Sequence, residues 1–366
     1  MSESNTAPVD ANEAAQGSAN KWLALAAITS AASTMFVDQT VASIASATLQ
    51  TELGLSEAGV QWVINGYLLS LSAFFALGGR LSDILGHKRM VLLGVTIFAV
   101  SSALCGATPD NSFAEAWLIV FRIIQGIGAA LLFPAALAIV VSTFPLKERG
   151  KALALFFGIT GGLTAIGPIM GGYLSEWTWR AIFWVNVPVA IIAIVLTLLA
   201  KVHTQHKREP LDYLGAVLIA AGMAFSVLGL QQASSWGWTD PRTIGSIVLG
   251  LILLAIFVKV ETRVKIPLIK VEIFKDRAFF VDNAVLFFAM MAFVPVFFFA
   301  SVYAQAVLGY NATNAGLYLL VFFAGFAPAV QVGGRILDKS GARAPVIIGC
   351  AVAAVGFFLW SQKLTD

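Results

Sequence analysis

The segment that decides the fold of this chain reads Gly79-Arg80-Leu81-Ser82-Asp83-Ile84-Leu85-Gly86-His87-Lys88-Arg89. It lies between two long apolar runs, so the chain has to reverse its direction within a few residues. Gly79 and Gly86 supply the permissive backbone where the two helices end. Asp83 is left at a helix end beside several cations, where it can accept charge-assisted hydrogen bonds. The segment therefore predicts a short polar loop between two membrane spans.

The composition excludes an ordinary soluble protein. Hydrophobic residues make up 58% of the chain and charged residues 12%, and the mean hydropathy is +0.85. Soluble domains have about 25% charged residues. The two cysteines and three histidines predict neither a disulfide framework nor a metal site. The sequence contains no phosphate-binding G-x-x-x-x-G-K-[ST] motif, so neither ATP nor another cofactor is expected.

Eleven mainly apolar runs are long enough to cross a hydrocarbon core of about 30 Å. They predict an all-α polytopic membrane protein. Their approximate extents are 22-46, 60-79, 90-108, 115-141, 150-173, 181-200, 211-231, 243-260, 278-304, 313-334 and 344-361.

The placement of the cations predicts the orientation, because Lys and Arg accumulate in cytoplasmic loops. One set of alternate loops holds almost all of them, at Lys88/Arg89, Lys147/Arg149/Lys151, Lys201/Lys207/Arg208, Lys259/Arg263/Lys265/Lys270/Lys275/Arg277 and Lys339/Arg343. The opposite loops hold little beyond Arg180 and Arg242. We therefore expect a multi-pass protein of the cell membrane whose N-terminus is cytoplasmic.

The opening segment resembles the signature loop of the major facilitator superfamily, G-x-L-a-D-x-x-G-r-k. It matches that loop at Gly79, Leu81, Asp83, Gly86 and Lys88. The resemblance implies a gating loop that latches the cytoplasmic ends of two helical halves. We expect six residues to form it, namely Gly79, Arg80, Asp83, Gly86, Lys88 and Arg89. The simpler alternative is an ordinary cationic loop.

A second copy of the loop follows the tenth span. Gly334 opens it, and Asp338 precedes Gly341 by three residues, as Asp83 precedes Gly86 in the first copy; Arg343 follows. The interval between the copies places two additional helices between the halves, as in the fourteen-helix drug:proton antiporter branch of the superfamily. The resemblance then implies a second half that stops three helices short, so that the chain is truncated at its C-terminal end.

This arrangement divides the chain into six predicted parts. They are a disordered cytoplasmic tail (1-21), a six-helix bundle (22-200), a cytoplasmic linker (201-210), two inserted helices (211-260), a cytoplasmic loop (261-277) and an incomplete three-helix bundle (278-366).

Asp38 lies past the middle of the first span, where an ionisable side chain costs about 2.5–3.5 kcal/mol on insertion scales. Its surroundings resemble the antiporters' motif L-D-x-T-v-v-N-v-A-L-P, although Ala47 replaces the proline. The resemblance implies that Asp38 binds a proton or a cationic substrate. Alternatively, it only pairs with another polar group of the interior.

Arg122 and Gln125 lie in a fourth-span segment that resembles the superfamily pattern l-x-x-x-R-x-x-q-G-x-g-a-a. Three residues apart on a helix, the two side chains share one face. Arg122 cannot lose its proton. The resemblance implies that it adjusts the proton affinity of a nearby carboxylic acid, whereas a structural Arg122 would only bond backbone carbonyls.

The fifth span resembles the antiporter motif g-x-x-x-G-P-x-x-G-G, with its first glycine displaced to Gly162. The motif's remaining residues are Gly167, Pro168, Gly171 and Gly172. Small residues at this density predict a groove for another helix, and the alternative to an antiporter role is a packing seam. Two further segments, Trp179 to Pro188 and Leu211 to Gly215, resemble W-R-w-i-F-x-i-N-v-P and f-D-y-l-G of the fourteen-helix branch.

Asp282 begins the ninth span and is either a helix cap, the reading we favour, or a second titrating group. Together these motifs imply proton-coupled efflux of hydrophobic, cationic drugs or toxic compounds by alternating access. The expected partners are the small-molecule substrate, protons and the lipid bilayer, with no nucleic acid, and the chain is expected to be a monomer and not an enzyme. Two alternatives remain open: export of an endogenous metabolite, or a truncated membrane protein that transports nothing.

Overall fold

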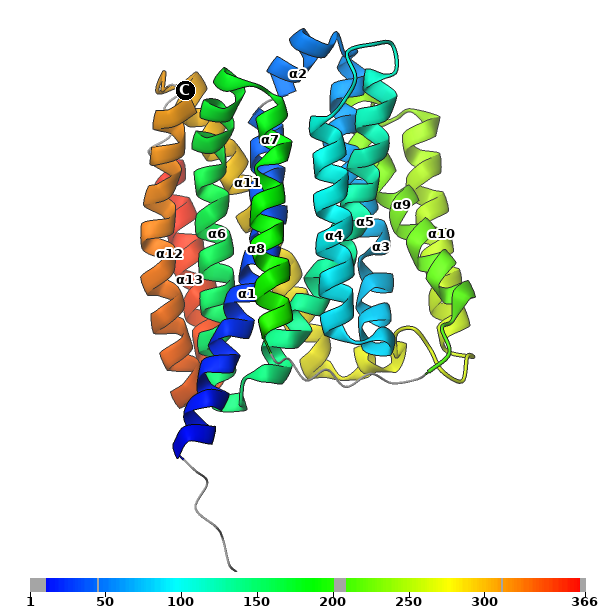
Figure 1. Ribbon diagram of the computed structural model, residues 1–366. Helices are drawn as coiled ribbons and strands as arrows, with labels where there is room; N and C mark the ends of the chain where they lie inside the picture. Colours follow the sequence, from blue (N-terminus) through cyan, green and yellow to red (C-terminus); the bar gives the residue numbers. More distant parts are fainter. Residues whose placement is uncertain (1–10, 45, 201–208, 311, 363–366) are drawn as a thin grey trace, which may run out of the picture.

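The computed structural model describes residues 11–44, 46–200, 209–310 and 312–362, with only the backbone described at some positions inside helices. These residues form a bundle of long helices that run side by side (Figure 1), and they contain no β-strand. The elements are α1 (Ala11–Ile44), α2 (Ser46–Leu53), α3 (Glu57–Leu85), α4 (His87–Gly106), α5 (Ala114–Thr143), α6 (Leu146–Trp177), α7 (Arg180–Trp184), α8 (Asn186–Leu199), α9 (Tyr213–Trp236), α10 (Pro241–Glu261), the 3₁₀ helix η1 (Val271–Lys275), α11 (Arg277–Ala306), α12 (Ala312–Ser340) and α13 (Arg343–Ser361).

The eleven predicted spans coincide with ten long helices and the pair α7–α8, which confirms the all-α membrane fold. Within the described residues, seven segments are long and apolar enough to cross a membrane: α3, α4, α5, α7–α8, α9, α10 and α13. The other four helices, α1, α6, α11 and α12, have 34, 32, 30 and 29 residues. They lie alongside the seven (Figure 1) and exceed the roughly 20 residues that span a bilayer.

Several helix bounds differ from the predicted ones. Helix α3 continues to Leu85, so Gly79, which was expected where the helix ends, lies within it, and Gly86 alone separates α3 from α4. Helix α1 already begins at Ala11, before the predicted start at position 22, because the segment is rich in strong helix formers such as Ala and Glu. The sixth span is divided at Val185 into α7 and α8. Pro188, in the first turn of α8, has no N–H to bond the carbonyl of Trp184, so the helix is interrupted one turn before it.

Helix α5 is the centre of the first six spans, because glycines let α3 and α4 approach it closely. A Cβ atom on Gly78 of α3 would collide with the backbone carbonyl of Ala130, and one on Gly126 would collide with that of Tyr67. Gly94 of α4 and Gly128 of α5 face each other in the same way. At the C-terminal end of α4, the indole of Trp184 fills the space beside Gly106 and so fixes α7 against α4.

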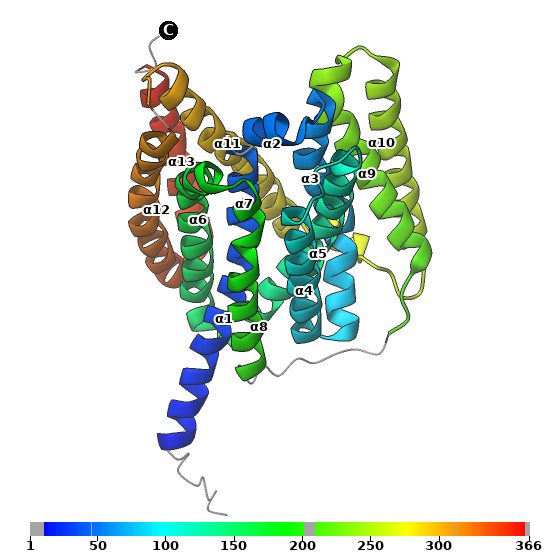
Figure 2. The same ribbon diagram turned by 45° about the horizontal axis from the view of Figure 1, so that its top comes forward.

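The two inserted helices lie outside this group. Helices α9 and α10 pack on each other, and α9 packs on α3 (Figures 1 and 2). Helices α12 and α13 lie on the opposite flank, where α12 packs on α6. Helix α13 has no buried residue. The two larger hydrophobic clusters of buried residues lie among the first six spans, and a smaller one lies between α9, α10 and the segment after α10.

The N-cap of α11 is Asp276, whose carboxylate accepts hydrogen bonds from the backbone N–H groups of Ala278 and Phe279. The capping role that we favoured for Asp282 is therefore wrong. Asp282 lies one turn further into the helix and is exposed. A cap has to precede the first helical residue, and the sequence offered two aspartates near that point.

Candidate functional site

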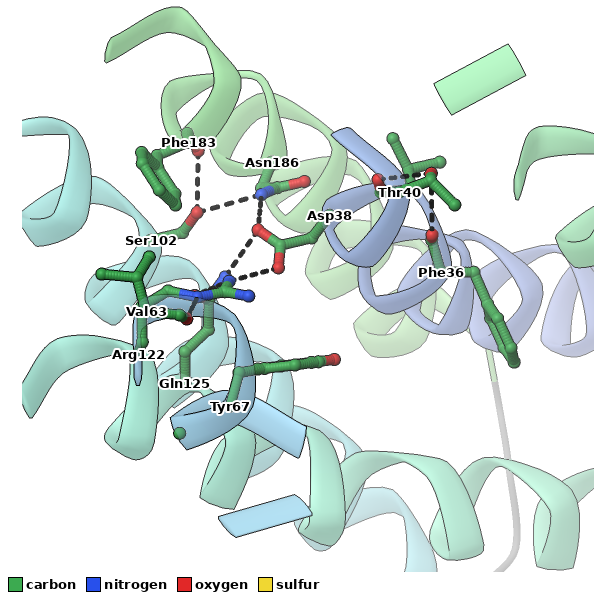
Figure 3. A network of polar contacts seen from close by, with 12 residues as sticks. Phe36, Asp38, Thr40, Val63, Tyr67, Ser102, Arg122, Gln125, Phe183 and Asn186 are labelled. Atoms are coloured by element: carbon green, nitrogen blue, oxygen red, sulfur yellow. Dashed lines mark hydrogen bonds and ion pairs between the residues drawn. The ribbon is translucent and has the colours of Figure 1, made fainter. Parts of the chain in front are cut away.

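Asp38 is completely buried in α1 and receives three hydrogen bonds (Figure 3). Arg122 Nη1 donates to Asp38 Oδ2 at 2.5 Å. Gln125 Nε2 and Asn186 Nδ2 donate to Asp38 Oδ1 at 3.0 and 2.8 Å. The donors come from α5 and α8, so the carboxylate joins three helices. The structure thus brings together Asp38, Arg122 and Gln125, the three residues that the sequence indicated.

Arg122 is 1% exposed, and its guanidinium group has further partners around it. Nε donates to the carbonyl of Val63 in α3 at 2.9 Å, and Nη1 also donates to Gln125 Oε1 at 2.8 Å. The ring of Tyr67 lies 4.5 Å from the guanidinium carbon and that of Phe183 lies 5.9 Å from it. Aromatic faces stabilise a cation at such distances. The guanidinium group therefore keeps partners even when Asp38 is not one of them.

Asn186 and Ser102 extend the network beyond the predicted residues. Asn186 Nδ2 also approaches Ser102 Oγ at 3.0 Å, and Ser102 Oγ donates to the carbonyl of Phe183 at 2.8 Å. Both side chains are buried. Asn186 belongs to the W-R-w-i-F-x-i-N-v-P resemblance, which was the one sequence signal that could have placed it here. Nothing in the sequence marks Ser102.

The hydrogen bonds of this network depend on the charge of Asp38. An ionised carboxylate accepts hydrogen bonds only, so all three donors suit the charged form of Asp38. Burying an ion pair carries a desolvation cost of several kcal/mol per ion, which the mutual attraction and the added hydrogen bonds offset. A proton on Asp38 would remove the charge that holds Arg122. The arrangement is therefore suited to coupling protonation of Asp38 to movement of α1 relative to α5.

The predicted gating loop is tied to neighbouring segments by its cations. Gly86, at φ +96°, joins α3 to α4. Arg80 Nη2 pairs with Glu209 Oε2 at 2.9 Å, and Lys88 Nζ donates to the carbonyl of Ala200 at the end of α8 at 2.9 Å. Arg89 is exposed, and so is Asp83, for which the described residues supply no ion-pair partner. The latch through Asp83 stays a prediction.

The predicted antiporter motif contacts α1 next to the buried network. Gly167 of α6 is buried, and a Cβ atom there would collide with Thr40 Oγ1, two residues after Asp38. Gly162 has no atom within 4 Å of the corresponding position, so no close helix contact is made there. Gly171 is buried, whereas Pro168 and Gly172 lie outside the residues whose side-chain surroundings are described. The close helix contact is thus at Gly167.

The second copy of the loop repeats the backbone turn of the first. Gly341 ends α12 at φ +73°, as Gly86 ends α3 at φ +96°. Gly334 lies within α12, and Arg343 is exposed at the start of α13. Asp338 lies outside the residues whose side chains are described. Among the described residues, no three His, Cys, Asp or Glu side chains are grouped to hold a metal ion.

Three proteins that are similar in sequence to this chain are named as resistance or export proteins. The chain is 33% identical over 348 residues to the tetracenomycin C resistance and export protein of Streptomyces glaucescens, covering 94% of this chain and 64% of that protein. It is 32% identical to the puromycin resistance protein of Streptomyces alboniger, covering 94% of this chain and 69% of that one. The cephamycin export protein of Amycolatopsis lactamdurans is 34% identical, with 90% and 68% covered.

The fold is also similar to that of solved transporters. The proton:xylose symporter XylE, bound to 6-bromo-6-deoxy-D-glucose, aligns with a TM-score of 0.59 and 15% identity, covering 88% of this chain and 70% of that one. Residues 24–362 match the family described as the Major Facilitator Superfamily. With the paired loop turns, the bundle of long helices and the buried Asp38 network, this match shows that the chain belongs to the Major Facilitator Superfamily.

Proposed function

We propose that this protein exports hydrophobic, cationic organic compounds in exchange for protons, by alternating access across the cell membrane. The observation that carries the proposal is the fully buried carboxylate of Asp38, which is held by Arg122, Gln125 and Asn186. The names of the three relatives, which refer to resistance or export, support this direction of transport. Since the chain spans 64% of the tetracenomycin relative, the activity of the whole protein is part of the proposal.

In this mechanism Asp38 binds either a proton or the cationic substrate. When neither is bound, Asp38 pairs with Arg122. Arg122 keeps its own proton throughout. When Asp38 is protonated, the guanidinium group retains the Val63 carbonyl, Gln125 and the ring of Tyr67. The helix that carries Asp38 is then free to move relative to α5, while Arg122 stays in place.

The energy of a proton gradient limits what this exchange can achieve. A membrane potential of ~100 mV contributes about 2.3 kcal/mol per proton, and a difference of ~1 pH unit about 1.4 kcal/mol. Exchange of one proton for one monovalent cation cancels the electrical part. The remaining part supports only about tenfold accumulation, so stronger export of a cation requires a second proton.

The proposed orientation places the N-terminus and the Gly79 to Arg89 loop in the cytoplasm. It follows from the distribution of Lys and Arg among the loops. We further propose that the protein acts as a monomer, with the substrate, protons and the bilayer as its partners.

The test is accumulation of a cationic dye in cells that express the chain. We expect expression to lower dye accumulation, Asp38→Asn to abolish the effect, and dissipation of the proton gradient to do the same. The matched control is Asp110→Asn, which removes the carboxylate of an exposed ion pair with Arg180 and should leave export unchanged. Equal dye levels with and without expression would refute drug export. Normal export by Asp38→Asn would refute the coupling role of Asp38.

A further inference from the structure

Two carboxyl groups meet where the inserted helices end, close to the α3–α4 loop (lower right of Figure 1). Asp212 precedes α9 as its N-cap, and its Oδ1 accepts from the N–H of Gly215 at 2.9 Å. Glu261 is the last residue of α10 and is 3% exposed. Its Oε2 accepts from the N–H of Ile269 at 3.0 Å. One oxygen of each carboxyl group therefore accepts a hydrogen bond from a backbone N–H.

The second oxygen of each group has no hydrogen-bond donor. Asp212 Oδ2 and Glu261 Oε1 are both buried, and neither has a partner among the described residues. Both oxygens lie beside the Cα atom of Gly215, because a Cβ atom on this residue would collide with each of them. The two oxygens therefore lie close to one another, beside Gly215. Two ionised carboxylates are acceptors only, so a hydrogen bond between them requires a proton on one.

Among the described residues, no cation forms an ion pair with Asp212 or Glu261. Arg80 of the neighbouring helix α3 pairs with Glu209 instead. The cations of α10 and the segment after it are all exposed and form no ion pair in the described part of the chain; they are Lys259, Arg263, Lys265 and Lys270. Lys201, Lys207, Arg208 and two histidines fall in 201–208, outside the described residues. Two adjacent carboxylates without a counter-ion cannot both stay ionised.

We propose that Asp212 and Glu261 share a single proton between Oδ2 and Oε1, and so form a second proton-binding site in addition to Asp38. One carboxyl group donates the proton and the other accepts it, which supplies the missing donor for both buried oxygens. A bridging metal ion is a poorer occupant, because the pair offers two carboxylates and no third ligand of the kind that metals favour.

The shared proton ties the start of α9 to the end of α10. Glu209, three residues before Asp212, holds Arg80 at the end of α3. Loss of the proton would place two negative charges in contact beside Gly215 and push the helix ends apart. The packing of the inserted helices against α3 at this end of the bundle therefore depends on pH.

Infrared difference spectroscopy of the full chain in detergent tests the site directly. We expect the wild type to show the absorption of a protonated carboxyl group that disappears as the pH rises, and both Glu261→Gln and Asp212→Asn to lack it. Asp38→Asn should retain it. Asp240→Asn is the matched control, because Asp240 caps α10 at its other end and pairs with Arg242. Absence of the band from the folded wild type, or its persistence in both variants, would overturn the proposal.

Thermal unfolding gives a second readout. The folded protein holds a proton that the separated carboxyl groups of the unfolded chain release, so the stability of the wild type should fall as the pH rises. Glu261→Gln carries a neutral amide and should flatten this dependence, which Asp240→Asn should leave as in the wild type. A rise in Tm on addition of Na⁺ at high pH, without the infrared band, would indicate a bridging ion instead and contradict a shared proton. Neither readout requires transport, so both remain informative if the proposed export fails.

Discussion

Asp38 and Arg122 form an ion pair in which neither side chain is more than 1% exposed. Removal of one partner from such a pair leaves an uncompensated buried charge, at a cost of about 3–5 kcal/mol. The network lowers this cost for Arg122, because its guanidinium group also contacts Val63, Gln125 and Tyr67. The carboxylate depends on side-chain donors alone. Asp38 is therefore the member of the pair whose charge state decides the geometry.

We expect Asn186→Ala to destabilise the protein by about 1–3 kcal/mol, because it leaves the buried Oδ1 of Asp38 with Gln125 as its only donor. The measurement is the free energy of unfolding in detergent. Asn283→Ala is the matched control: its amide donates to a backbone carbonyl on the exposed surface of α11, and the change should stay within about 0.5 kcal/mol. Equal effects of the two substitutions would contradict the role of Asn186.

The sequence predicted Asp38, Arg122 and Gln125 because charged or amide groups within apolar runs are conspicuous. The contact between Asn186 and Asp38 was not predictable, since it joins residues far apart in the chain and depends on how α8 packs against α1. Ser102 could not be found either, because serines are common in membrane helices and only the position of Asn186 gives this one a role.

At the scale of elements, glycine determines which helices approach closely. Gly78, Gly94, Gly126 and Gly128 all lie where α5 meets α3 or α4, and a side chain at any of them would meet backbone. Gly158 and Gly162 of α6 have no neighbouring atom within 4 Å. The named glycines of α3, α4 and α5 thus pack against backbone, whereas Gly158 and Gly162 of α6 do not.

We expect Gly78→Ala to lower stability by about 1–3 kcal/mol, because the added methyl group meets the rigid carbonyl of Ala130 and the helices have to separate. Gly158→Ala should instead raise stability by ~0.5–1 kcal/mol, since alanine is the better helix former and the space is empty. Thermal unfolding of both variants checks the pair. If Gly158→Ala lowered the stability as much as Gly78→Ala, this result would contradict the open space beside Gly158.

The number and order of the long apolar spans were predictable from the apolar runs. The break between α7 and α8 was not predicted, although Pro188 was visible, because proline in the first turn of a helix is equally compatible with an unbroken span that starts later. The antiporter motif was expected to form a groove for another helix, without a particular residue of closest approach. The close contact occurs at Gly167, where the facing residue on α1 is the small Thr40.

At the scale of the whole molecule, the first six spans enclose a packed interior, whereas α13 on one flank has no buried residue. Cys105 of α4 is buried and Cys350 of α13 is exposed, so the two cysteines of the chain report on these two regions. The assignment of 22-200 as one bundle and 278-366 as another stays a prediction from the spacing of the two loops.

We expect a maleimide reagent to modify Cys350 and leave Cys105 unmodified in the detergent-solubilised protein, because only the first thiol is accessible. Mass spectrometry of the whole chain should show a single addition, and Cys350→Ser should abolish it. Modification of Cys105 at the same rate would contradict the packed interior. No modification at all would show that the outer face of α13 is covered in solution.

The position of Trp184 gives the chain an optical probe of its buried network. Its indole ring lies against Gly106 of α4, and Asn186, the donor to Asp38, follows two residues later across the break between α7 and α8. A change in the charge of Asp38 that alters its bond to Asn186 would displace the start of α8 and with it the indole. The fluorescence of Trp184, isolated by comparison with Trp184→Phe, would then follow the protonation of a group that solvent cannot reach, without any attached label.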